Sequence, residues 1–210
     1  MHEKVNDLWH CGDPQEWFRA LECYQRLVPP KNVNLDQAMD SPDLKQRIGQ
    51  LDPEGWYAFL HDEYVRWKYG AAANRLATAR YWLKQNSLDQ LYAIRKDILQ
   101  LNGEDILKGL ETAKKIKGLG TAGASGLLAL LYPQKFATVD QFVVKALRKV
   151  SGLPEAHHIA KIKKPENLST QDGVLLIKIM RRKAEENNRL FNTSDWTPRK
   201  IDKVLWAYGR

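Results

Sequence analysis

The chain has 210 residues, of which 43% are hydrophobic and 28% charged, and its formal net charge at pH 7 is +8. This composition is typical of a folded globular protein and argues against a largely disordered chain. No stretch approaches the roughly 20 apolar residues of a membrane helix, and acidic side chains within residues 1–30 exclude a secretory signal. Two cysteines, Cys11 and Cys23, cannot make a disulfide framework, so we expect a reduced compartment such as the cytoplasm.

Apolar side chains recur at helical spacing along most of the chain. A helix is predicted to begin at Pro14 and to end at about Val28, where two prolines follow. Residues 31–52 are mixed and turn-rich, and Pro53 suits the first turn of a helix that reaches about Lys68. The later predicted helices span residues 74–85, 88–101, 104–116, 140–150, 171–189 and 197–208, with a further apolar helix that follows the glycine cluster 118–126 and reaches Tyr132.

Local signals mark several helix ends. Ser87 is a predicted N-cap, Asn102-Gly103 ends a helix, and Thr197 followed by Pro198 begins one. No segment shows a convincing strand pattern of alternating apolar residues, and the chain has no internal repeat. The sequence therefore predicts an all-α protein of about ten helices.

The positive charge is unevenly distributed. Residues 1–63 are net acidic, whereas residues 64–183 carry the basic excess. A basic region of this kind favours a polyanionic partner, because phosphates attract Lys and Arg and binding releases counterions. The alternative is a solvated basic surface that the acidic N-terminal part balances.

Residues 104–132 predict two helices joined by a tight turn. Gly118 and Gly120 in that turn permit positive φ and a close approach of another backbone. The amides that follow lie at the start of the second helix, where backbone N–H groups and the helix dipole bind phosphate. The alternative is that the two glycines merely permit a tight helical hairpin.

The run Ile116-Lys-Gly-Leu-Gly-Thr-Ala-Gly-Ala-Ser-Gly-Leu-Leu is followed by Pro133 and then by Phe136-Ala-Thr-Val-Asp140. This order of a glycine hairpin, a proline and an aspartate after a short apolar run resembles the helix-hairpin-helix DNA glycosylases. The close resemblance covers residues 104–150. It implies an all-α fold of two lobes with a cleft between them. The residues that it assigns to the DNA backbone are Lys117, Gly118, Leu119, Gly120, Thr121, Ala122 and Gly123.

The resemblance also implies a division of the chain. Residues 54–150 form the glycosylase core, with the hairpin at 104–132 and the aspartate segment at 137–150. Residues 1–53 are an acidic helical part that packs on this core, and residues 151–210 are C-terminal helices that close it.

The family's catalytic aspartate corresponds to Asp140. Breaking an N-glycosidic bond builds positive charge on C1′ of the sugar, and a fixed carboxylate stabilises that charge and can orient or deprotonate the attacking water. We assign Asp140 to electrostatic stabilisation first and to water activation second. Its position just before the helical residues 141–150 is also that of an N-cap, and on the residues alone this structural role is the favoured one.

Members of the family that also cleave the DNA strand carry a lysine two positions after the second hairpin glycine, and its amine forms a Schiff base. Ala122 stands at that position in this chain. We therefore expect a monofunctional enzyme without lyase activity. A displaced amine, supplied by Lys114, Lys115, Lys117 or Lys145, is the alternative.

Many family members also hold an iron–sulfur cluster on four cysteines near the C-terminus. No cysteine follows Cys23 here, so we expect no such cluster and no metal held by side chains. The resemblance is compatible with a monovalent or divalent cation bound by hairpin carbonyls.

Excision requires the target nucleotide to be turned out of the duplex and the gap to be filled. The resemblance puts the gap-filling loop around residues 68–74. Aromatic side chains stack on a flipped base, although packing between helices is the alternative role for each of them. Basic residues in this region, Lys68 included, either contact phosphate or are solvated. The candidate base-pocket or wedge residues are Trp67, Tyr69, Asn74 and Arg75.

Together these features predict a DNA glycosylase that hydrolyses the N-glycosidic bond of a modified or damaged base in double-stranded DNA. The resemblance implies a monomer in a reduced compartment that contains DNA, such as a bacterial-type nucleoid, with no membrane partner. Two alternatives stay open. One is a non-catalytic helix-hairpin-helix DNA-binding protein, and the other is a helical protein whose basic face meets an acidic protein partner.

Overall fold

The computed structural model describes residues 4–210, and helices make up most of this part of the chain. No strand occurs among these residues, so the all-α prediction is confirmed. The helices exceed the ten or so expected, because several are only five to seven residues long. None of the helices within residues 4–210 is long and apolar enough to cross a bilayer.

The N-terminal elements are α1 (Val5–Trp9), α2 (Pro14–Leu27), the 3₁₀ turn η1 (Pro30–Asn32), α3 (Val33–Met39) and α4 (Leu44–Gln50). Helix α2 confirms the helix predicted from Pro14. Helices α3 and α4 correct the turn-rich interpretation of residues 31–52. Both are too short to show a clear period, and they are stabilised by burying Met39, Leu44 and Ile48 in the core.

One continuous helical run follows, made of α5 (Pro53–Ala58), the π-helix η2 (Phe59–Tyr64) and α6 (Val65–Tyr69). It matches the helix predicted over 53–68, except that the sequence analysis did not foresee the π-helix. Phe59 and Tyr64 are five residues apart, and this spacing places their rings on one face with centroids 6.4 Å apart. Both side chains are buried.

The middle of the chain forms α7 (Ala73–Leu83), α8 (Leu88–Leu99), α9 (Ile106–Lys114) and α10 (Thr121–Leu131), close to the predicted bounds. Ser87 is the expected N-cap of α8, where its hydroxyl accepts the Gln90 amide. Together α9 and α10 form the predicted helical hairpin.

The C-terminal part contains α11 (Gln141–Leu147), α12 (Ala156–Ala160), α13 (Thr170–Phe191) and α14 (Pro198–Gly209). Thr197 caps α14 as predicted, by accepting the Lys200 amide at 3.1 Å. The short helix α12 lies in a polar stretch for which no helix was predicted.

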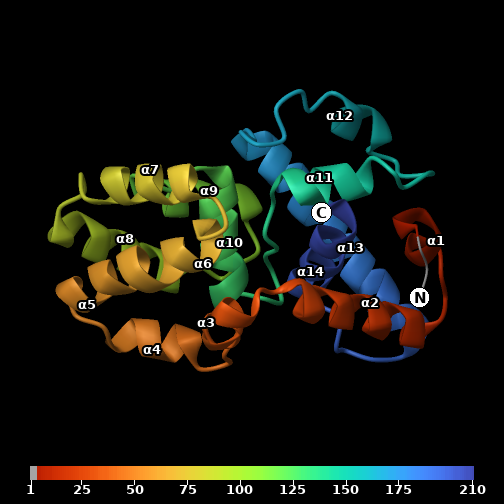
Figure 1. The fold of residues 1–210 in the computed structure, drawn as a ribbon, viewed down its shortest axis with the longest axis horizontal. Coiled ribbons are helices and arrows are strands. Elements are labelled where there is room, and N and C mark those ends of the chain that lie inside the picture. The colour runs from red at the N-terminus through yellow and green to blue at the C-terminus, as the bar shows by residue number, and fades with distance from the viewer. Residues whose placement is uncertain (1–3) are drawn as a thin grey trace.

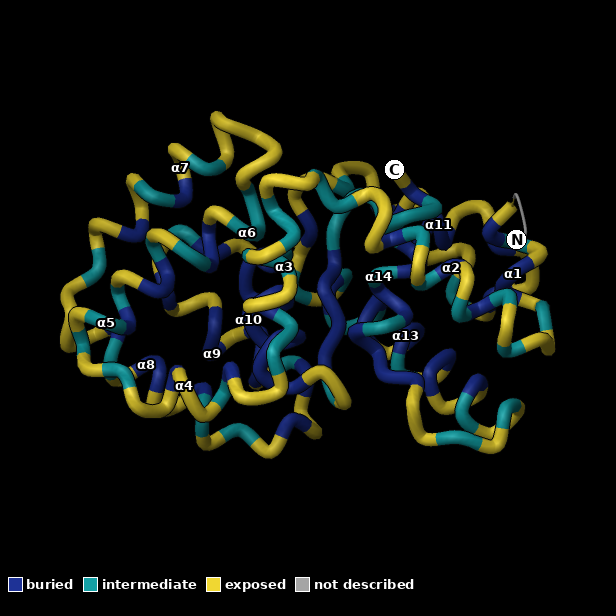
Figure 2. The backbone as a smooth tube through the Cα atoms, turned by 60° about the horizontal axis from the view of Figure 1, so that its bottom comes forward, coloured by how far each residue is buried: buried dark blue, intermediate teal, exposed yellow. Residues whose placement is uncertain are grey.

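Helix α10 lies in the middle of the molecule, with α4–α9 on one side of it and α1, α2 and α11–α14 on the other (Figure 1). Helices α9 and α13 pack against α10, and α14 packs against α11 and α2. Nearly all of α10 is buried, whereas most of α7 is exposed (Figure 2). The division of the chain at residues 53 and 150 stays a prediction.

Candidate active site

The two hairpin glycines differ in their surroundings. Gly118 has φ +103°, and a Cβ there would lie 2.7 Å from the Ala79 carbonyl oxygen of α7. Only glycine fits such a position, and its presence lets the turn pack on α7. Gly120 has φ −73°, and a Cβ there would meet nothing within 4 Å. Both glycines permit positive φ, and only Gly118 adopts it, while Gly120 faces open space at the start of α10.

A pocket of about 320 Å³ opens beside this turn. It brings the hairpin together with three of the four predicted base-pocket residues. Trp82 also lines the pocket, and its side chain is half exposed. The lining residues are Tyr69, Asn74, Arg75, Thr78, Ala79, Trp82, Gly118, Gly120, Thr121, Ala122, Glu166, Asn167 and Leu168.

Trp67, the fourth predicted residue, is not part of this pocket. Its indole N–H donates to Asp36 at 2.9 Å, and its ring packs between Tyr64 and Arg199. These contacts indicate the packing role that the sequence analysis kept as the alternative.

Tyr69 lies where the pocket meets α10. A Cβ on Gly123 would be 2.5 Å from the Tyr69 hydroxyl oxygen, so the small residue makes room for the ring. Burial raises the pKa of Tyr69 to about 12, against the opposing effect of Arg75, and the phenol therefore stays protonated at neutral pH.

Lys117 is tied to the end of α7. Its amine donates to the Gln85 carbonyl at 3.0 Å, and its backbone exchanges hydrogen bonds with the Asn86 side chain. The other lysines considered as displaced amines also have partners. Lys114 donates to Thr170, Lys115 pairs with Asp97, and Lys145 lies over the Phe142 ring.

Asp140 caps α11, as its position predicted. Its Oδ1 accepts the backbone amides of Phe142 and Val143 at 2.9 and 3.2 Å. Its other oxygen, Oδ2, lies 3.7 Å from Nζ of Lys68, and 16% of the Asp140 side chain is exposed. The carboxylate is therefore fixed in place and partly accessible.

Lys68 is the partner of Asp140 that sequence reasoning did not foresee. It was interpreted as a phosphate contact or a solvated residue, but only 9% of its side chain is exposed. Burial lowers its pKa, while the negative charges of Asp140 and Asp202 oppose this effect. The Lys68–Asp140 pair joins α6 to the start of α11.

The small residues of α10 allow this approach. A Cβ on Gly126 would lie 2.8 Å from the Tyr64 hydroxyl oxygen and 3.4 Å from Cδ of Lys68. Gly120, Gly123 and Gly126 follow one another at a spacing of three, which is one face of a helix. That spacing is the sequence signal that could have placed α6 against α10. Lys68 therefore lies against Gly126, which is about one helical turn along α10 from Ala122 in the pocket wall, whereas neither Lys68 nor Asp140 lines the pocket itself.

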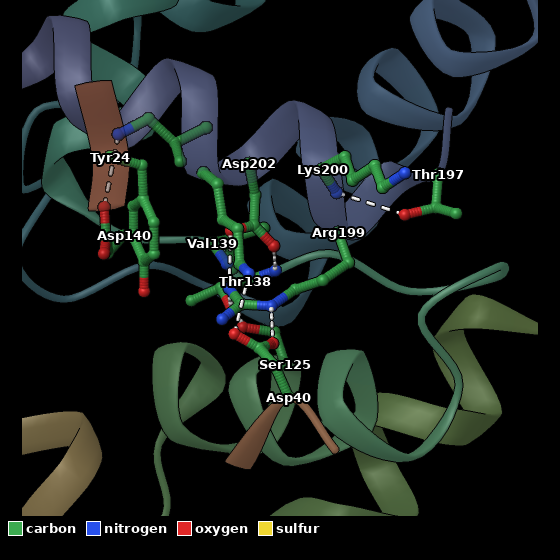
Figure 3. A network of polar contacts seen from close by, with 12 residues as sticks. Tyr24, Asp40, Ser125, Thr138, Val139, Asp140, Thr197, Arg199, Lys200 and Asp202 are labelled. Atoms are coloured by element: carbon green, nitrogen blue, oxygen red, sulfur yellow. Dashed lines mark hydrogen bonds and ion pairs between the residues drawn. The ribbon is translucent and has the colours of Figure 1, made fainter. Parts of the chain in front are cut away.

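The segment between α10 and α11 is held on both sides (Figure 3). The Thr138 amide donates to Asp202 of α14 at 2.7 Å, and the Val139 amide donates to the Ser125 hydroxyl of α10 at 3.0 Å. Thr138 and Val139 are buried. These bonds fix the extended backbone that leads into Asp140.

A buried ion pair supports this segment. Arg199 donates to Asp202 at 2.7 Å and to Asp40 at 3.2 Å, and its guanidinium also reaches the Thr138 hydroxyl (Figure 3). Burial raises the pKa of Asp202 to about 6, although the Arg199 charge and the Thr138 amide act in the opposite direction. Asp202 and Asp40 in turn raise the pKa of Arg199 in spite of its burial.

A larger pocket of about 600 Å³ lies elsewhere, between α2, α3 and α14. Asp36 and Asp40 line it, and none of the predicted site residues do. Lys203 also lines the pocket and pairs with Asp40 at 2.7 Å, so the lining is net negative by one charge and suits a nucleic acid less well than the pocket at the hairpin.

The hairpin carbonyls were also considered as cation ligands. The Ile116 carbonyl oxygen accepts the Leu119 amide at 3.1 Å, and the Lys117 carbonyl oxygen accepts the Asn86 side chain at 3.1 Å. Within residues 4–210, no three His, Cys, Asp or Glu side chains form a group that could hold a metal ion. A cation at the hairpin carbonyls stays a prediction, and no step of the chemistry below is assigned to one.

The comparisons with known proteins leave the family open, since the chain matches no protein-family model, no curated protein and no solved structure.

Proposed function

We propose that this chain is a DNA glycosylase that cleaves the N-glycosidic bond of a modified or damaged base flipped out of duplex DNA. The observation that carries the proposal is the position of Asp140. Its carboxylate is fixed by two amides of α11 and partly exposed. It does not line the pocket itself, but its partner Lys68 lies against Gly126, about one turn of α10 beyond Ala122 of the pocket wall. A rigid, partly exposed carboxylate whose partner lies near a groove with basic and aromatic walls suits glycosidic bond cleavage.

In this proposal the start of α10 binds the DNA backbone. Gly120 leaves space for a phosphate, and no side chain caps the helix, so its first amides are available as donors. Arg75 adds positive charge from α7, and Lys117 adds it from the turn. The helices on the two sides of α10 serve as the two lobes of a helix-hairpin-helix glycosylase fold.

The base-binding role falls to the pocket walls. Tyr69 and Trp82 offer ring surfaces, and Asn74 offers an amide that can bond to a base edge. The sugar of the everted nucleotide then lies toward Asp140. As the base leaves, positive charge grows on C1′ and the carboxylate stabilises it.

A second function is favoured by one specific observation. Both oxygens of Asp140 already have structural partners, because Oδ1 caps α11 and Oδ2 faces Lys68. A non-catalytic DNA-binding protein with the same hairpin would show the same contacts. The two functions therefore differ in what Asp140 does, and not in where it lies.

The discriminating experiment uses duplexes that each carry one modified base, followed by alkaline cleavage at any abasic site formed. The Asp140→Asn variant keeps a capping side chain, since Asn is as good an N-cap as Asp, but it loses the charge. We expect base release to fall by roughly a hundredfold or more while duplex affinity changes little. The binding function predicts equal affinity and no base release by either protein.

Asp105→Asn is the matched control. Asp105 caps α9, the first helix of the hairpin, by accepting the Lys108 amide at 2.9 Å. It therefore undergoes the same chemical change at a comparable position outside the proposed site. Base release by Asp105→Asn should equal that of the unmodified chain. If a broad set of duplexes shows no release by any of the three proteins, the glycosylase proposal is wrong.

A further inference from the structure

Three neighbouring lysines between α12 and α13 keep their charges free. Lys161, Lys163 and Lys164 are exposed, and within residues 4–210 none of their side chains has a hydrogen-bond or ion-pair partner. We call residues 161–164 the lysine segment. Three unpaired charges within four residues attract a polyanion, whereas paired charges are already neutralised by the protein itself.

Other basic side chains around the lysine segment are occupied. Arg148 of the α11 end donates to the Ile162 carbonyl oxygen. Arg182 of α13 forms a two-bonded ion pair with Glu155 at 2.5 and 2.7 Å. These arginines hold the polypeptide in place, and they leave the three lysines as the charges that a ligand can meet.

The backbone of the lysine segment is fixed rather than loose. Ile162 lies between the lysines and is buried, as are Ile159 before the segment and Leu168 after it. The Arg148 side chain bonds to the middle of the segment. A fixed backbone lowers the entropy that is lost when a partner binds, because fewer groups have to be ordered.

The lysine segment leads directly into the pocket beside the hairpin. The Asn167 amide donates to the Lys164 carbonyl oxygen at 2.9 Å, which closes a turn. Asn167 lines the pocket together with Gly120 and Ala122 of the hairpin. Lys164 is therefore one turn away from the wall of the pocket in which the proposed function places the DNA.

The start of α13 is also held against the hairpin. A Cβ on Gly173 would lie 2.6 Å from Cγ2 of Thr121, the first residue of α10. The Lys114 amine, at the end of α9, donates to the Thr170 hydroxyl at 2.6 Å. The segment between α12 and α13 thus ends beside the glycine turn, as its path toward α10 in Figure 1 shows.

The spacing of the lysines suits a nucleic acid strand. Residues 161 and 164 can be at most about 11 Å apart along the chain, and one DNA strand has a phosphate for about every 3.4 Å of helix axis. The three lysines therefore match about three consecutive phosphates. A membrane surface fits less well, because membrane-bound segments insert apolar side chains beside their basic ones. The large hydrophobic side chains exposed within residues 4–210 all lie outside residues 149–168, and they are Leu27, Tyr81, Trp82, Leu88 and Leu190.

We propose that the lysine segment is a second phosphate-binding surface, on which the DNA strand held at the start of α10 continues beyond the pocket. This inference rests on the proposed binding of DNA at the hairpin. Glu166 is the acidic residue between the segment and the pocket, and it is exposed. It lies where the base and sugar of the everted nucleotide are expected, so the phosphates meet the lysines on one side of it and the hairpin amides on the other.

The test measures affinity for a duplex that carries one tetrahydrofuran analogue of an abasic site, at several salt concentrations. A triple variant with Lys161→Gln, Lys163→Gln and Lys164→Gln should lose three phosphate contacts. The slope of the logarithm of the binding constant against the logarithm of salt concentration should become smaller by about 2.7. Affinity at about 0.1 M salt should fall at least tenfold.

Two control variants separate local contacts from total charge and from folding. Lys31→Gln, Lys108→Gln and Lys178→Gln together remove the same charge from exposed, unpaired lysines that do not line the pocket. This variant should change the slope by less than about one. The triple Lys→Arg variant of the lysine segment keeps the charge and should retain both affinity and slope. All variants should melt at the temperature of the unmodified chain, because each change is at an exposed side chain.

Equal loss of affinity in the two triple Lys→Gln variants would mean that only total charge matters, and it would overturn the inference. Vesicles that contain phosphatidylserine test the other class of partner. If the Lys161, Lys163 and Lys164 variant lost vesicle binding and kept its duplex affinity, the surface would belong to a membrane and the inference would be wrong.

The result for the lysine segment is separable from that for the glycosylase proposal. Base release by a chain whose affinity does not depend on the three lysines leaves the glycosylase proposal standing and removes the second surface. Loss of affinity in the triple variant, without base release from any modified duplex, supports the second surface in a non-catalytic DNA-binding protein. A chain that binds no duplex contradicts both.

Discussion

Gly118 and Gly120 show how much a single position depends on its surroundings. Both stand in the same turn and look equivalent in the sequence, yet only Gly118 has a positive φ and a backbone oxygen against its α-carbon. The sequence analysis correctly assigned a turn to these residues. It could not separate a glycine needed for folding from one that leaves space, because the difference comes from α7, which is distant in the chain.

Substitution of the two glycines by alanine should therefore affect the stability of the fold to different extents. Gly118→Ala should lower the free energy of unfolding by about 1–3 kcal/mol, since it forces an L-residue into a sparsely populated backbone region and against Ala79. Gly120→Ala should change it by less than about 0.5 kcal/mol. Urea unfolding of the two variants checks this, and equal losses would contradict the description of the turn.

Gly120 also allows a test of binding that leaves the fold intact. Gly120→Glu adds a negative side chain where the proposed phosphate lies, while its φ of −73° suits any residue. Duplex affinity should fall at least tenfold with an unchanged melting temperature, because like charges repel at a helix N-terminus that would otherwise bind phosphate. Unchanged affinity would indicate that DNA binds elsewhere.

At the scale of elements, caps were predictable and the contacts between elements were not. Ser87, Thr197 and Asp140 act on amides two or three residues away, so their roles follow from local sequence. The contact between Lys68 and Asp140 depends on how α6 packs against α10. The π-helix before α6 was also missed. Phe59 and Tyr64 fit an ordinary α-helix equally well if one of the two is taken to lie at the surface.

The segment before α11 should make stability depend on pH. The pKa of Asp202 is about 6 in the folded state, against about 3.9 for an unperturbed Asp, so the folded state holds this proton more tightly. Its contribution to the free energy of unfolding is full below about pH 4 and is lost as the pH rises through about 6. In the Asp202→Asn variant this side chain does not titrate, so the variant should not lose this contribution to the free energy of unfolding as the pH rises.

The comparison that isolates Asp202 is the difference in unfolding free energy between the unmodified chain and Asp202→Asn. This difference should become smaller as the pH rises from 4 to 7. All other groups titrate in both proteins and cancel. A difference that stays constant or grows over this range would show that Arg199 keeps Asp202 ionised throughout.

For the whole molecule, composition and periodicity sufficed for the fold class, and the basic middle of the chain suggested a polyanionic partner. The structure shows that part of this charge is used internally. Arg181 donates to the carbonyls of Gly103 and Lys135, and Lys183 is buried against Trp9. Arg75 remains exposed at the pocket beside the hairpin. Charge counting could not make this distinction, because it depends on which side chains meet after folding.

Duplex affinity should accordingly fall steeply with salt. A plot of the logarithm of the binding constant against the logarithm of salt concentration should be linear with a negative slope. Arg75→Gln should reduce the size of that slope by about one and weaken binding to all sequences alike, as loss of one phosphate contact does. Affinity that does not respond to salt would favour the acidic protein partner considered as an alternative.

The contact between Lys68 and Asp140 joins two stretches of chain that are far apart in the sequence, because Lys68 belongs to α6 and Asp140 follows α10. A partly unfolded polypeptide therefore holds an isolated amine and an isolated acid. The chemistry proposed for Asp140 thus requires a completely folded chain, and a polypeptide that has not finished folding should lack it.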